Sequence, residues 1–175
     1  AARRGECDLA GIHLLDPATE RYNEPFLSAD LELIRGYRRM QGIVYRPGDA
    51  RFDGQSVETA IARARVDPQC VMVNRNRGSG TRILIDRLLK GATPPGYALQ
   101  PRNHNAVAAA VAQGRADWGL AVESVARKAG LGFLPVTEEQ YDFAVPKSRR
   151  QRSAVEAFCR LLADPDIRAT LAQLG

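Results

Sequence analysis

The chain has 175 residues, a net charge of +5 and 45% hydrophobic residues, which is typical of a globular protein with its own core. Arginine supplies 22 of the 25 basic residues, and we interpret its clusters as solvated faces rather than a nucleic-acid surface. The three cysteines are odd in number and lack metal-ligand spacing, so we expect no metal site. No run is apolar enough for a membrane span or signal region, which predicts a cytoplasmic protein without membrane attachment.

Apolar patterning predicts strands that alternate with helices along the chain. The expected strands are 8–15, one or two within 31–46, 70–73, 117–122, 132–136 and 141–145. The expected helices are one that follows a Ser56 cap, then 79–90, 106–113, 123–129, 153–163 and a last one from Pro165. Such alternation favours an α/β fold with mostly parallel strand pairing.

The segment VNRNRGSGTR joins the strand 70–73 to the helix 79–90. A strand, a small-residue turn and a helix start form an anion cradle, because the first N–H groups of a helix lack intrahelical partners and the helix dipole adds positive charge. Gly80 allows close approach of a ligand, while Ser79 and Thr81 can cap the helix or donate hydroxyl hydrogen bonds. Three arginines bracket this turn: Arg75, Arg77 and Arg82.

The turn does not match the common phosphate or nucleophile motifs. GxxxxGKS/T is absent, Ile83 occupies the third glycine position of GxGxxG, and Ser79 lies in GSG rather than GxSxG. The alternative is a well-capped strand-to-helix turn that binds nothing. We favour anion binding because arginines accompany the free N–H groups.

A second helix start follows at NHN, where Asn103 or Asn105 is expected to cap the helix 106–113. In α/β sheets, ligands bind beyond the carboxyl ends of strands beside helix starts, so both starts are expected to converge on one anion. Glu123, directly after the strand 117–122, either faces this site or caps its own short helix.

Catalysis is not indicated by the spacing of reactive residues. The only histidines are His13 and His104. A hydrolase with Ser79 as nucleophile and His104 as base can be drawn, but no motif supports it. We therefore expect a non-enzymatic protein without cofactor or metal.

The chain resembles the periplasmic-binding-protein-like domain of molybdate/tungstate-type regulators. The segments that carry the resemblance are DLAGIHLLDPATERYN, RRMQGIVYRPGD, VNRNRGSGTRILIDRLL, NHNAVAAAVAQGRADWGLAVES and GLGFLPVTEEQYDFAVPKS. The resemblance implies a type II fold of two α/β lobes with a cleft between them. Lobe one would comprise residues 1–46 and 139–175, and lobe two residues 47–138.

In this family the ligand is a tetrahedral oxyanion, held by N–H and hydroxyl groups without metals. The matching positions are Ser79, Gly80 and Thr81 at one helix start, and Asn105, Ala106 and Val107 at the other, with Arg77 and Arg82 supplying positive charge. The tyrosine that reaches the oxyanion in classical molybdate binders has no counterpart here, because Val122 stands after DWGLA. A small organic anion is the alternative ligand.

The resemblance also implies partners. Related domains are fused to a helix-turn-helix DNA-binding module or to a molybdopterin-biosynthesis protein. The chain is therefore expected to be a sensor of small anions in molybdenum-related regulation or cofactor biosynthesis. The alternative is an accessory domain of a molybdopterin-biosynthesis enzyme that binds a phosphorylated pterin or a protein partner.

Lobe one of such a domain normally begins with a strand and a helix that have no match in this sequence. A lobe without its central strand exposes backbone edges that need a partner. We expect an upstream segment, a homo-oligomer or a strand-exchanged dimer to supply the strand. A stable, well-folded monomer in size-exclusion chromatography with light scattering would contradict this expectation.

Overall fold

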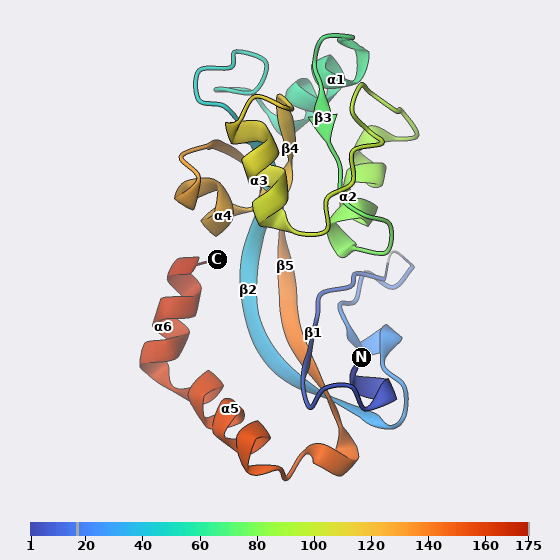
Figure 1. Cartoon of the computed structure of the whole chain (residues 1–175), viewed down its shortest axis with the longest axis vertical. Helices are drawn as coiled ribbons and strands as arrows, with labels where there is room; N and C mark the ends of the chain where they lie inside the picture. The colour runs from blue at the N-terminus through green and yellow to red at the C-terminus, as the bar shows by residue number, and fades with distance from the viewer. Residues whose placement is uncertain (17, 175) are drawn as a thin grey trace. The chain divides into compact units, whose positions relative to one another are not determined.

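The computed structural model describes residues 1–16 and 18–174. The chain divides into two compact units: unit 1 comprises Ala1–Arg39 and Glu139–Gly175, and unit 2 comprises Met40–Glu138. Two long strands, β2 (Leu31–Tyr45) and β5 (Gly132–Pro146), run from one unit into the other (Figure 1). The strand order is β1-β5-β2-β4-β3, and helices accompany it, so the predicted α/β fold class is confirmed.

Unit 2 packs helices on both faces of its strands, and the alternation of side chains along each strand explains how. Its further elements are α1 (Val57–Val66), β3 (Met72–Val73), α2 (Gly80–Leu89), α3 (His104–Ala112), β4 (Trp118–Val122) and α4 (Glu123–Lys128). Ile43 and Met72 join a buried cluster with α1 and α2 residues. Their neighbours Val44 and Val73 join a second cluster with α3 and α4 residues. Successive side chains of a strand point to opposite faces of the sheet, so neighbouring apolar residues of one strand enter different cores.

Three helices of unit 2 begin at polar caps that the sequence contains. The Ser56 hydroxyl accepts a hydrogen bond from the Thr59 N–H at 3.2 Å, which confirms the predicted start of α1. The helix expected to begin at residue 106 is α3, and it begins two residues earlier. Asn103 is its cap, and α3 therefore begins at His104 and contains Asn105.

The expectation of mostly parallel pairing is wrong. β2 pairs with β4 antiparallel, from Gln41 opposite Val122 to Tyr45 opposite Trp118, and only β3 pairs with β4 in the parallel sense. β2 enters unit 2 from unit 1, so its direction is not set by a helical crossover. β3 and β4 are joined through α2 and α3, and this is the connection that parallel strands require.

The region 31–46 forms one strand despite its two glycines. A Cβ at Gly36 would lie 2.1 Å from the Tyr141 carbonyl oxygen, and a Cβ at Gly42 would lie 2.4 Å from the Leu134 carbonyl oxygen. These glycines therefore allow close backbone approach rather than breaking β2.

The two strands expected at 132–136 and 141–145 are also one strand, β5. One of the polar residues between them, Glu139, has a buried charge within unit 1. Glu139 is 1% exposed and pairs with Arg39, and its other oxygen lies 3.3 Å from His13 Nδ1. Burial acts to raise the pKa of Glu139, but the contacts with His13 and Arg39 outweigh it and hold that pKa below its usual value.

Strand β1 (Ala10–Ile12) is shorter than the predicted 8–15, and it pairs antiparallel with β5. Asn23 explains the early end, because its side chain and backbone take both polar groups of Leu14. The Leu14 N–H donates to Asn23 Oδ1 at 2.9 Å, and the Asn23 N–H donates to the Leu14 carbonyl at 2.9 Å.

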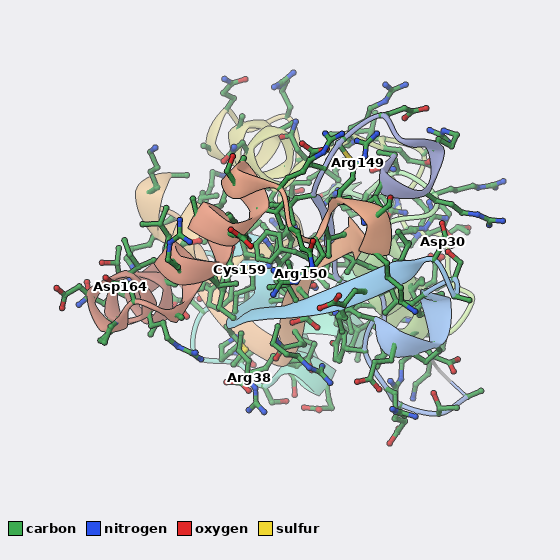
Figure 2. All side chains as sticks on the ribbon, turned by 90° about the horizontal axis from the view of Figure 1, so that it is seen from below. Asp30, Arg38, Arg149, Arg150, Cys159 and Asp164 are labelled. Atoms are coloured by element: carbon green, nitrogen blue, oxygen red, sulfur yellow. The ribbon has the colours of Figure 1, made fainter. Side chains whose placement is uncertain are left out.

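Two helices end the chain, α5 (Ser153–Ala163) and α6 (Pro165–Leu174), as predicted. Phe158 of α5 packs edge-on against Phe143 of β5, with ring centroids 4.7 Å apart. Asp164, labelled in Figure 2, ends α5 and caps α6 by accepting the Asp166 N–H at 2.9 Å. The described part of unit 1 also contains three short 3-10 helices, Ala2–Arg4, Glu24–Phe26 and Lys147–Arg149. Within the described residues, no helix combines the length and apolar character of a bilayer crossing.

The segment 95–101 covers the outer edge of β3. The N–H groups of Met72 and Asn74 donate to the carbonyls of Pro95 and Leu99 at 2.7 and 2.8 Å. Gly96 makes this approach feasible, since its φ is +83° and an added Cβ would lie 2.0 Å from the Met72 carbonyl oxygen.

We predict that Gly96→Ala lowers the free energy of unfolding by about 3 kcal/mol or more, because it combines left-handed strain with a backbone collision. Gly54→Ala is the matched control: its φ is +69° and nothing lies within 4 Å of the added Cβ. That variant should lose only about 1 kcal/mol. Urea denaturation measures both, and equal losses would contradict the prediction.

Candidate functional site

The turn from β3 into α2 is built by hydrogen bonds of its own small residues. The Ser79 hydroxyl accepts the Arg82 N–H at 3.2 Å and donates to the Asn76 carbonyl at 3.0 Å. Gly78 adopts φ +85°, which allows the chain to turn tightly before the helix. Ser79 is therefore the cap of α2, and its hydroxyl is engaged within the turn.

The cap leaves the first N–H groups of α2 available. Gly80 and Thr81 are the first two helical residues, and their N–H groups have no acceptor among the residues that the structure describes. The Thr81 side chain is fully buried, and its hydroxyl oxygen has no hydrogen-bond partner within the described chain. Buried hydroxyl groups are normally paired, so this one is a candidate ligand donor.

The start of α3 has the same construction. Asn103 Oδ1 accepts the Ala106 N–H at 2.8 Å, and the Asn103 carbonyl accepts the Val107 N–H at 3.3 Å. The expected donors at Ala106 and Val107 are thus already used, and Val107 lies in the α3–α4 core. The Asn105 N–H has no acceptor among the described residues.

Arg75 links the two helix starts, although its sequence position alone does not predict this role. It is 5% exposed, and its Nη1 lies 3.1 Å from Nδ1 of His104. Its Nη2 donates to the Arg102 carbonyl at 3.2 Å. The guanidinium therefore ties the end of β3 to the beginning of α3 and adds buried positive charge there. The only sequence feature that indicates this role is an arginine two residues after a predicted buried strand.

Arg82 is engaged by its own helix and the covering segment. Its Nε lies 2.9 Å from both Asp86 oxygens, Nη2 donates to the Tyr97 hydroxyl at 2.6 Å, and the guanidinium stacks 4.6 Å from the Tyr97 ring centroid. Nη1 also donates to the Arg75 carbonyl at 3.3 Å. Burial acts to lower the pKa of Arg82, but the bonds to Asp86 and Tyr97 raise it above its usual value.

The two remaining expected residues differ in their surroundings. Arg77 is exposed beside the turn, and its guanidinium has no partner among the described residues. Glu123 begins α4 and pairs with Arg127 of the same helix at 3.0 Å. No described contact joins Glu123 to either helix start.

This arrangement suits anion binding better than hydrolysis. The Ser79 hydroxyl donates to a backbone carbonyl, while the His104 ring contacts Arg75, so these two residues do not form a nucleophile–base pair. Three helix-start N–H groups, a buried hydroxyl and two arginines are all donors. Within residues 1–16 and 18–174, no three His, Cys, Asp or Glu side chains cluster as a metal site.

Comparisons with known proteins agree with this architecture. A family profile described as the PBP superfamily domain matches residues 1–163. A Bacillus subtilis (strain 168) protein, the uncharacterized YvgK, is 30% identical over 182 residues. The match covers 98% of this chain and 56% of that protein, so the chain spans little more than half of this relative.

Solved structures of low sequence identity share the fold. An ABC-type phosphate transport receptor from Vibrio cholerae has a TM-score of 0.60 at 12% identity, over 99% of this chain and 81% of that chain. The Synechocystis PCC6803 CcmR regulatory domain in complex with 2-PG has a TM-score of 0.64 at 13% identity, over 92% and 74%. The predicted type II periplasmic-binding-protein-like fold is thereby confirmed.

We predict that Arg82→Lys destabilises the protein by about 2 kcal/mol, because lysine cannot bridge Asp86, Tyr97 and a carbonyl at once. Arg87→Lys, an exposed change on the same helix, should alter stability by less than about 0.5 kcal/mol. Urea denaturation of the two variants provides the comparison. A loss in Arg87→Lys as large as that in Arg82→Lys would contradict the assignment.

Proposed function

Because the chain belongs to the PBP superfamily, we propose that it is a non-catalytic ligand-binding domain whose unit 2 holds a small anion at the starts of α2 and α3. The ligand is a molybdate- or tungstate-like oxyanion, with a small organic anion as the alternative. The domain acts in the cytoplasm as a sensor for molybdenum-related regulation or cofactor biosynthesis. A DNA-binding or molybdopterin-biosynthesis module, fused or upstream, receives the signal, and the protein is a homo-oligomer or strand-exchanged dimer.

The observation that carries the proposal is the buried, unpartnered hydroxyl of Thr81 beside open N–H groups. Gly80, Thr81 and Asn105 offer N–H donors at two helix starts, where the helix dipoles favour negative charge. Ser79 supports this geometry as the cap of α2. A tetrahedral oxyanion has several acceptor oxygens and can therefore accept more of these hydrogen bonds than a neutral ligand with one carbonyl.

The arginines have different roles in this proposal. Arg77 has a guanidinium available for the ligand, whereas Arg82 and Arg75 position the turn and the start of α3 and contribute positive potential. Glu123 is proposed as a further ligand-binding residue because it directly follows β4 at the start of α4. Ligand binding would favour a closed arrangement by its differential affinity for the two states.

A phosphorylated pterin is less well supported as the ligand. It would require an aromatic face on which to stack. Tyr97 lies near the turn, but the Arg82 guanidinium covers a face of its ring at 4.6 Å. The oxyanion remains the preferred ligand on this ground.

We predict that molybdate, tungstate or sulfate raises the melting temperature of the protein at constant ionic strength. At 100 times the dissociation constant, mass action stabilises the folded state by about 2.7 kcal/mol. For a chain of this size that corresponds to a rise of roughly 5–10 °C. The double variant Ser79→Ala/Thr81→Val should remove the rise, and differential scanning fluorimetry measures both responses.

Ser56→Ala is the matched control for the lost helix cap, since Ser56 caps α1 in the same way as Ser79 caps α2. This variant should have a lower initial melting temperature and keep the full ligand-induced rise. An unchanged rise in the double variant would refute the site assignment. The absence of any rise with all three oxyanions would instead favour an organic anion.

A further inference from the structure

Unit 2 contains a cavity that runs along α3 and extends past the end of that helix. Its volume is about 300 Å³. It lies between α3 and the segment 99–101, and its main walls are Val73, Leu99, Pro101, Ala106, Ala110 and Arg115. Arg115 follows the opposite end of α3 from Asn103, so this cavity has a charged group of its own, separate from the helix starts.

Most wall residues of the cavity are apolar, and one of them, Leu99, is exposed to solvent. Leu99 is 50% exposed although its backbone is fixed, because its carbonyl accepts the Asn74 N–H at 2.8 Å. Val73 beneath it is 2% exposed and belongs to the core. An apolar ligand that covered Leu99 would remove its side chain from water at no cost in backbone rearrangement.

Arg115 adds a cation to this apolar surface. Its backbone N–H donates to the Ala110 carbonyl at 2.9 Å, which fixes the residue beside the cavity. Its side chain is exposed and has no hydrogen-bond or ion-pair partner among the residues that the structure describes. Gln100 is the other polar wall residue, and no carboxylate lines the cavity.

We propose that this cavity is a second binding site, which takes a small amphipathic carboxylate with a short alkyl tail. The tail lies against Val73, Leu99 and Ala110, and the carboxylate pairs with the Arg115 guanidinium. A cavity of this volume is at the small end of ligand pockets, which limits the ligand to roughly ten non-hydrogen atoms. The site does not depend on the proposed oxyanion function.

Hexanoate is the probe, and amide and methyl NMR shifts of the full chain are the measurement. We expect saturable shifts at Val73, Leu99, Ala106 and Ala110, with a dissociation constant on the order of millimolar for so small a ligand. Hexan-1-ol should bind more weakly and hexylammonium more weakly still, because Arg115 attracts only the carboxylate.

Arg115→Gln should weaken hexanoate binding about five- to tenfold, by loss of one exposed charge-assisted pair, and leave hexan-1-ol unchanged. Arg87→Gln, an exposed arginine outside the cavity, is its control. Ala110→Phe should abolish binding of both probes by filling the cavity, whereas Ala112→Phe on the exposed side of α3 should not. If Ala110→Phe fails to fold, Leu99→Asp replaces it: loss of the apolar wall weakens binding of both probes, and the added negative charge also repels hexanoate.

Three results would overturn the proposal. One is the absence of saturable shifts at the wall residues. Another is equal hexanoate affinity in the parent protein and Arg115→Gln. The third is a set of shifts at Gly80 and Thr81 rather than at Leu99 and Ala110, which would place the carboxylate at the helix starts.

Discussion

The organisation of unit 2 depends on two buried arginines, Arg75 just after β3 and Arg82 in the first turn of α2. Arg82 reaches from α2 to the Arg75 carbonyl, and Arg75 reaches from the strand end to the start of α3. A guanidinium can make several directed hydrogen bonds at once, so these two side chains hold a strand end and two helix starts in a fixed relation. Burial of an unpaired polar group costs free energy, so other arrangements of these arginines are disfavoured. The observed arrangement is therefore specific as well as stable.

The helix caps explain why N–H groups at the two helix starts remain without acceptors among the described residues. The cap side chains of Ser79 and Asn103 each take the third N–H of their helix and leave earlier N–H groups without an acceptor. Beside them, Arg75 and Arg77 place positive charge, which favours negative over positive charge at these helix starts. Within the described residues, the two helix starts therefore present hydrogen-bond donors without acceptors of their own.

The two units differ in how they use burial. The strands of unit 2 alternate between two apolar cores, whereas β5 in unit 1 buries the carboxylates of Glu139 and Asp142. Asp142 accepts the Asn23 side-chain amide at 2.8 Å and the Gly36 N–H at 2.9 Å. Because these carboxylates are paired, the polar residues can belong to a continuous strand. Hydrophobic patterning does not reveal such pairing, and it therefore predicts two strands in place of β5.

The sequence by itself determined the α/β class, most helix starts and the position of the glycine-rich strand-to-helix turn. These features are local: a Ser56 or Ser79 cap needs only the next three residues, and apolar periodicity needs only one turn or strand. Strand direction, the continuity of β2 and β5 and the choice of Asn103 over Asn105 as a cap were decided by the folded structure. So were the roles of Arg75 and Arg82, because a long side chain can bond to any segment that the fold brings near it, and sequence spacing does not record which segment that is.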